Sequence, residues 1–93
     1  MAENMVREFI TFSGDVQGVG FRYKMSHLAR FYGVTGWVRN EYDGTVTAEL
    51  QGRPENLDKI IQSLNQDSYI RLYDIDRRKR ALEDDESGFR VLY

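Results

Sequence analysis

The order of two kinds of hydrophobic pattern constrains the fold of this chain more than any other feature. Apolar residues follow helical spacing in two stretches, one from Phe21 to Tyr32 and one from Pro54 to Leu64. The segments around them alternate instead, or are rich in β-branched and aromatic residues, as strands are. The patterns predict the order β-α-β-β-α-β, in which two helices pack on one face of an antiparallel sheet.

Turn residues and breaks in the pattern define the element ends. We expect strands at 6–13, 35–41 and 45–51, another that begins at 70, and a short C-terminal strand at 89–93. Gly33 suits the end of the first helix and Pro54 the start of the second. Ile75 follows Leu72 by three positions instead of two, which predicts a bulge or a switch of face. The fold expected is an α+β ferredoxin-like sandwich, formed by a single domain over residues 1–93.

Composition narrows the partners and the compartment. The chain has no cysteine, so it has neither disulfides nor thiolate metal ligands, and the start from Met1 to Asn4 carries no apolar run typical of a secretion signal. No apolar stretch approaches the ~20 residues that span a bilayer. The net charge of -2 offers no electrostatic reason to bind nucleic acid. We expect a cytoplasmic monomer whose partner is a small molecule, with no membrane or nucleic-acid partner.

A glycine-rich segment between the first strand and the first helix is the candidate binding site. Its glycines allow successive backbone N–H groups to converge, and the helix that follows directs its positive dipole end to the same point. Arg22, the second residue of that helix, carries a planar fork of donors that matches two phosphoryl oxygens. The site predicted is this arginine with the backbone amides of Asp15, Val16, Gln17, Gly18, Val19 and Gly20. By spacing alone, a turn that serves only packing and an arginine that faces water remain an equal alternative.

Two motifs give the sequence a specific resemblance. The pattern G-x-V-Q-G-V-x-F-R is met from Gly14 to Arg22, and G-W-V-x-N followed by D-G-x-V and a later glycine is met from Gly36 to Gly52. The chain resembles the acylphosphatases over nearly its whole length. The resemblance implies hydrolysis of acyl phosphates, with Arg22 binding the phosphoryl group and Asn40 orienting the attacking water. It implies no metal and no cofactor, with inorganic phosphate as product and competitive ligand.

The chemistry of an acyl phosphate explains how so few residues suffice. Its leaving group is a carboxylate whose conjugate acid has a pKa near that of glutamic acid, about 4.3, so it departs as the anion without a general acid. Holding the phosphoryl oxygens and placing a water are the tasks that remain. An asparagine amide can hold a water but cannot act as a base near neutral pH. Without the motif, Asn40 next to the turn at Asp43 would be read as bonded to local backbone.

Other residues are given no part in the chemistry. His27 lies opposite the apolar arc of its helix and is expected at the surface, and the carboxylates from Glu83 to Glu86 lack the spacing of a calcium loop. The charged stretch from Arg77 to Glu86 is interpreted as a solvated, partly self-neutralising connection. Asp15 is expected to weaken substrate affinity, and the segment from Gln66 to Tyr69 departs from the family's usual Gly-Pro pair, which leaves its conformation open.

Three other functions fit parts of the sequence. An RNA-binding module shares the element order, but its motif belongs on a central strand. A non-catalytic anion-binding or interaction module on the same fold is the main alternative. A segment of a larger carbamoyl-transfer maturation protein is less favoured, because we expect the chain to be complete. The sequence leaves the physiological acyl phosphate open.

Overall fold

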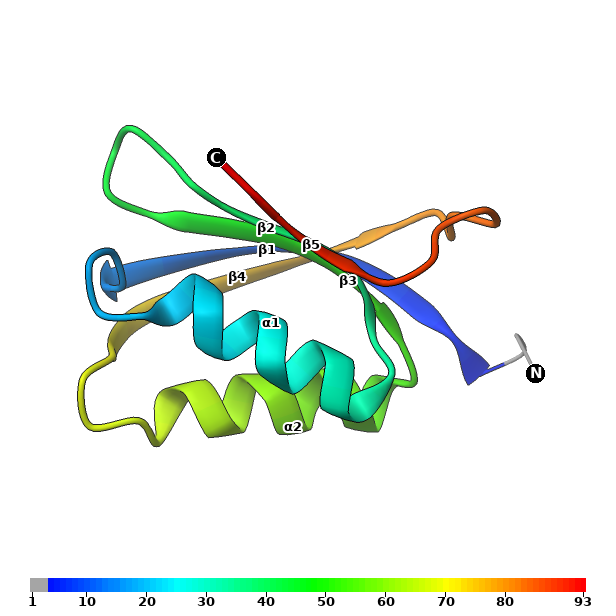
Figure 1. Cartoon of the computed structure of the whole chain (residues 1–93), viewed down its shortest axis with the longest axis horizontal. Helices are drawn as coiled ribbons and strands as arrows, with labels where there is room; N and C mark the ends of the chain where they lie inside the picture. The colour runs from blue at the N-terminus through cyan, green and yellow to red at the C-terminus, as the bar shows by residue number, and fades with distance from the viewer. Residues whose placement is uncertain (1–3) are drawn as a thin grey trace.

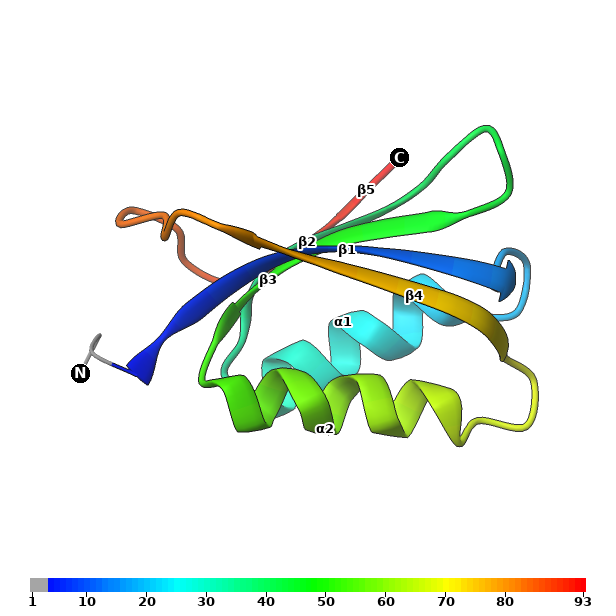
Figure 2. The ribbon, with the colours of Figure 1, turned by 180° about the vertical axis from the view of Figure 1, so that it is seen from behind.

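A computed structural model describes residues 4–93, which form a five-stranded sheet with two helices on one face (Figures 1 and 2). The elements in chain order are β1 (Val6–Asp15), α1 (Phe21–Tyr32), β2 (Thr35–Asn40), β3 (Val46–Gly52), α2 (Pro54–Asn65), β4 (Arg71–Arg80) and β5 (Phe89–Leu92). The strands lie in the order β4-β1-β3-β2-β5. The predicted ferredoxin-like α+β sandwich is confirmed.

The hydrophobic core lies between the helices and the sheet. Alternation along β1 places Ile10 and Phe12 on the helix side, where both are fully buried. The ring of Phe12 packs against that of Phe21 in the first turn of α1, with centroids 5.0 Å apart. This contact fixes the start of α1 relative to the end of β1, so the segment between them is anchored on both sides. No helix within residues 4–93 is long and apolar enough to cross a membrane.

The predicted irregularity in the fourth strand is a β-bulge. Ser13 is opposite Asp74 but Gly14 is opposite Leu72, so Tyr73 is the extra residue of β4. Gly14 has a φ of 135°, and a Cβ atom there would lie 2.1 Å from the backbone oxygen of Arg71. Only glycine fits this approach, and the position lies immediately before the candidate loop.

The last strand joins the sheet in a direction that the sequence pattern did not reveal. β4 and β5 lie at opposite edges, so the connecting segment 81–88 crosses from one edge to the other. β5 then runs parallel to β2, with Val38 opposite Val91. The sheet is therefore mixed, and the expected antiparallel pairing holds for the other four strands.

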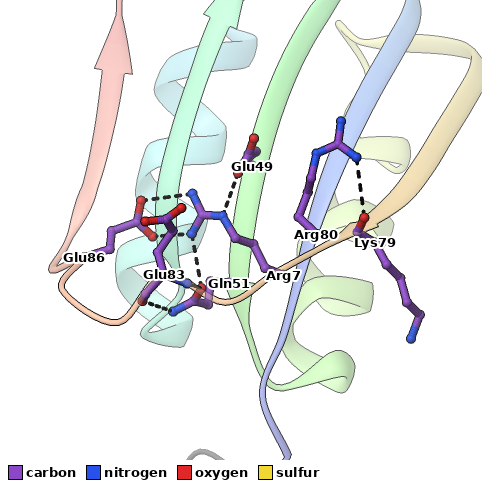
Figure 3. A network of polar contacts seen from close by, with 7 residues as sticks. All are labelled: Arg7, Glu49, Gln51, Lys79, Arg80, Glu83 and Glu86. Atoms are coloured by element: carbon purple, nitrogen blue, oxygen red, sulfur yellow. Dashed lines mark hydrogen bonds and ion pairs between the residues drawn. The ribbon is translucent and has the colours of Figure 1, made fainter.

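The crossing segment is fastened to the open face of the sheet through Arg7 (Figure 3). Arg7 is 4% exposed, donates to both carboxylate oxygens of Glu86 at 2.7 and 3.2 Å, and donates to Glu49 at 2.6 Å. Gln51 and the backbone of Glu83 exchange two further hydrogen bonds of 2.8 and 3.0 Å. These contacts hold the segment in place before β5 begins.

The interpretation of Arg77 to Glu86 as a solvated, partly self-neutralising connection is right about exposure, because residues 77–85 are exposed, but wrong about the connection and the neutralisation. The basic run continues β4 up to Arg80, and the acidic run supplies the carboxylate that pairs with Arg7. Among the ion pairs of residues 4–93, none joins the two runs; Arg77, for example, pairs with Glu8 at 2.6 Å. Charge order along the chain misled because the partners are Asp76 on β4 itself, Glu8 on β1 and Asp58 on α2, and none of them belongs to the acidic run.

Asp67 organises the segment between α2 and β4. Its carboxylate accepts from the backbone N–H of Tyr69 at 2.7 Å and from the Lys24 ammonium at 2.7 Å. Lys24 belongs to α1, so this aspartate also ties the segment to the other helix. The pair of contacts keeps the pKa of Asp67 below its ordinary value, chiefly through the hydrogen bond from Lys24. A local carboxylate thus shapes the segment in which the family's Gly-Pro pair is missing.

Candidate active site

The glycine-rich segment reaches α1 through two left-handed residues. Gly18 has a φ of 76°, and Gly20, the N-cap of α1, has a φ of 79°. No side chain caps the helix at Gly20, so the amides of the first turn face the loop without a side-chain acceptor. This arrangement suits an anion at the helix start, because the dipole is positive there.

Arg22 is held in place by the C-terminal residues. It is the second residue of α1 and donates from Nη1 to the backbone oxygen of Leu92 at 3.3 Å. The carbon at the centre of its guanidinium lies 5.0 Å from the centroid of the Tyr93 ring. The final residues of the chain thus fix the direction of the arginine, a relationship that no sequence motif indicates.

Asn40 reaches the same place from the sheet. It is the last residue of β2 and is half-buried. No hydrogen bond within residues 4–93 involves its side chain, so the alternative in which the amide bonds to turn backbone is not what the structure has. The amide is therefore available to a ligand or a water.

One cavity of about 380 Å³ brings these groups together. Its lining consists of residues from the loop, α1, β2 and the C-terminus: Val16, Gly18, Gly20, Phe21, Arg22, Tyr23, Ser26, Arg30, Asn40, Val91 and Tyr93. Two arginines line this cavity and no aspartate or glutamate does, so the charge of its side chains suits an anion.

The loop residues divide into two groups. Val16, Gly18 and Gly20 line the cavity, whereas Asp15, Gln17 and Val19 do not. Val16 and Val19 also contribute to the core. Asp15 closes β1 and its carboxylate accepts from the Tyr73 hydroxyl at 3.3 Å, outside the cavity lining.

The side chain of Gln17 joins the loop to the β2–β3 hairpin. Its Nε2 donates to the backbone oxygens of Glu41 and Thr45, at 2.8 and 2.9 Å. Figure 1 shows the loop and the hairpin at the same end of the sheet. Sequence reasoning used only the backbone amide of Gln17 and missed this role, although a glutamine among glycines was a signal for a specific side-chain contact.

The hairpin beside Asn40 has its own polar contacts. Asp43 accepts from both the N–H and the hydroxyl of Thr45, at 3.0 and 2.6 Å. Glu41 accepts from the hydroxyl of Thr47 and the guanidinium of Arg39, and these two bonds keep the pKa of Glu41 below its ordinary value. Together with Gln17, they define the turn that follows Asn40.

The cavity is also lined by three residues of α1 that the motifs did not single out. Tyr23, Ser26 and Arg30 belong to this group, and the spacing of Ser26 and Arg30 from Arg22 by four and eight residues was the available signal. His27 is exposed on the same helix and does not line the cavity, as expected.

These features define an α+β sandwich with an arginine-lined, anion-compatible cavity between a glycine loop and the end of a strand. Comparison with known proteins gives the family. The family model described as Acylphosphatase matches residues 8–91. An acylphosphatase of Clostridium acetobutylicum is 39% identical over 90 residues, which cover 96% of this chain and 99% of the relative.

Solved structures agree. The acylphosphatase from Bacillus subtilis superposes with a TM-score of 0.86 at 27% identity, covering 95% of this chain and 99% of that one. The acylphosphatase from Coxiella burnetii superposes with a TM-score of 0.87 at 28% identity, covering 97% of this chain and 95% of that one. The chain belongs to the acylphosphatase family, and it is an enzyme that hydrolyses acyl phosphates.

Proposed function

We propose that Arg22 and the amides of the loop and first helical turn hold the phosphoryl group, and that Asn40 positions the water that attacks it. The observation that carries the proposal is the single cavity lined by both side chains. Arg22 has a fixed direction through Leu92 and Tyr93, and the amide of Asn40 is left for a water. The cavity supplies positive charge at one wall and an uncharged amide at the other.

The reaction then requires only that the water be positioned and that charge on the phosphoryl oxygens be stabilised. The water oxygen bonds to phosphorus while the bond from phosphorus to the carboxyl oxygen breaks, and the electron pair leaves with the carboxylate. A proton of the water passes to an oxygen of the phosphoryl group, so the products are a carboxylate and inorganic phosphate. Arg22 and the amides stabilise charge on the phosphoryl oxygens, and Asn40 orients the nucleophile.

Phosphate release from two substrate classes tests this mechanism. Acyl phosphates should be hydrolysed and simple phosphomonoesters should not, because no group is assigned to protonate an alkoxide leaving group. Inorganic phosphate should compete with the substrate. Comparable turnover of both classes would overturn the leaving-group argument, and phosphate inhibition that is not competitive would move the site elsewhere.

We further propose that the enzyme acts on small acyl phosphates as a cytoplasmic monomer, without cofactor, membrane or nucleic acid. Support comes from the absence of cysteine and the net charge of -2. Within residues 4–93, no three His, Asp or Glu side chains are grouped so as to hold a metal ion. Light scattering during gel filtration tests the monomer, and a mass of twice 10.9 kDa would refute it.

A further inference from the structure

Arg30 lies along α1 beyond Arg22, on the wall of the same cavity. The two arginines are eight residues apart, which corresponds to about 12 Å along the helix axis at 1.5 Å per residue. Ser26 lies between them at helical spacing and lines the cavity too, although only 4% of it is exposed. The cavity therefore extends along α1, past the place assigned to the phosphoryl group.

The charges around this wall favour a second anion. The α1 segment from Phe21 to Tyr32 has no acidic residue. Its Lys24 is neutralised by Asp67 at 2.7 Å, whereas none of the ion pairs within residues 4–93 includes Arg30. No aspartate or glutamate side chain lines the cavity either, so the exposed Arg30 guanidinium is available to bind an anionic group of a ligand.

The facing wall suits the carbon skeleton of a substrate. Val91 of β5 and Tyr93 after it line the cavity; Val91 is half-buried, whereas Tyr93 is 99% exposed and its ring lies over the Arg22 guanidinium. A substrate whose phosphoryl group lies at Arg22 can pack its acyl chain against Val91 and extend toward Arg30. Resting on the function proposed above, we infer that Arg30 and Ser26 form a subsite for a second anionic group, so the preferred substrates are acyl phosphates whose acyl part ends in a carboxylate or a phosphate.

A matched pair of aromatic acyl phosphates tests the subsite. 4-Carboxybenzoyl phosphate carries the second anion, and 4-carbamoylbenzoyl phosphate has nearly the same shape without the charge. The wild type should show a higher kcat/KM for the carboxylate, and the preference should shrink as salt rises. Arg30→Met should lower the ratio of the two kcat/KM values about two- to fivefold, mainly through KM, on the scale of an exposed ion pair.

Two variants serve as comparisons. Arg30→Lys keeps the charge and should retain most of the preference. Arg53→Met removes an exposed arginine that does not line this cavity, and it should leave the ratio unchanged. Circular dichroism and thermal unfolding check that each variant is folded.

The outcomes separate the two proposals. A wild type that hydrolyses both substrates with equal kcat/KM, or an Arg30→Met ratio equal to that of the wild type, overturns the subsite and leaves the assignment of Arg22 and Asn40 standing. A wild type that hydrolyses both substrates while phosphate fails to compete overturns the proposed site, and the subsite with it. An anionic preference that is lost in Arg30→Met and kept in Arg30→Lys and Arg53→Met supports the inference.

Discussion

The side-chain amide of Gln17 donates to the backbone oxygen of Glu41 at 2.8 Å, which ties the loop of the candidate site to the residue after Asn40. A second bond of 2.9 Å reaches Thr45 across the hairpin. One glutamine thus sets the distance between the loop and the strand end, the two parts of the site that come from different motifs.

Replacing Gln17 with leucine should therefore impair turnover more than stability. Both carbonyls keep a backbone donor, Gly44 for Glu41 and Glu41 for Thr45, so we expect a loss of about 1 kcal/mol or less in the free energy of unfolding. Asn40 loses the hydrogen bonds of Gln17 that hold the neighbouring backbone in place, so kcat should fall about tenfold. Gln62→Leu, at an exposed position of α2, is the matched control for kinetics and urea unfolding. Equal kcat values for the two variants would show that the hydrogen bonds of Gln17 are dispensable for turnover.

Arg22→Lys should nearly abolish activity and weaken phosphate binding. Lysine keeps a positive charge but loses the planar fork that engages two oxygens at once, and it cannot stack on Tyr93 in the same way. Calorimetric titration with inorganic phosphate and steady-state kinetics measure the two effects. Arg53→Lys, outside the cavity, controls for the exchange itself. A variant with near-normal kcat/KM would reduce the role of Arg22 to that of a point charge.

Asn40→Ala should separate binding from turnover. Its side chain makes no hydrogen bond within residues 4–93, so the fold should be intact and phosphate should still bind. Loss of the amide that orients the water should lower kcat by about 10²-fold or more, as for other positioned transition-state groups. The same calorimetric and kinetic measurements apply. If phosphate binding disappeared as completely as in Arg22→Lys, the separate roles of the two residues would be refuted.

Glu86→Gln should destabilise the protein in a pH-dependent way. Burial raises the pKa of Glu86, but the hydrogen bonds and the charge of Arg7 outweigh it and leave that pKa below its ordinary value. The stabilisation is therefore present at neutral pH and is lost as the pH falls below about 4.3. At pH 7 the variant should lose about 1–3 kcal/mol, because Arg7 keeps Glu49 as a partner.

Urea unfolding at pH 7 and at pH 3.5 measures this dependence. The difference in the free energy of unfolding between the wild type and Glu86→Gln should be smaller at the lower pH. Glu83→Gln is the matched control, because Glu83 holds Gln51 through its backbone only. If this difference in the free energy of unfolding were the same at both pH values, the charge of Glu86 would not be the source of the stabilisation.

Hydrolysis of an acyl phosphate should persist in excess chelator. The proposed mechanism assigns the phosphoryl charge to Arg22 and to backbone amides, and no step passes through a metal. Phosphate release measured before and after dialysis against chelator checks this, with a metal-dependent phosphatase treated alongside as a positive control. Inactivation that a divalent ion reverses would require a different account of charge stabilisation.

The sequence was enough to predict the main elements because their signals are local. Helical spacing of apolar residues depends only on neighbours along the chain, and both helices are where it predicted them. Gly33 ends α1 and Pro54 begins α2, also as expected. The irregular spacing around Leu72 predicted a bulge or a switch of face, and the structure has the bulge, which Gly14 accommodates. The loop and Arg22 are adjacent in sequence, so their proximity needed no tertiary information.

Only the tertiary structure decided which distant groups meet. Asn40 shares a cavity with Arg22 because β2 ends beside the loop, and Gln17 bonds to Glu41 across 24 positions. Arg7 is buried because the segment 81–88 crosses the sheet over it, which no pattern near Arg7 or Glu86 encodes. Local patterns fix what each segment becomes, whereas contacts between segments depend on how the whole sheet buries its apolar face, and that is a property of the chain as a whole.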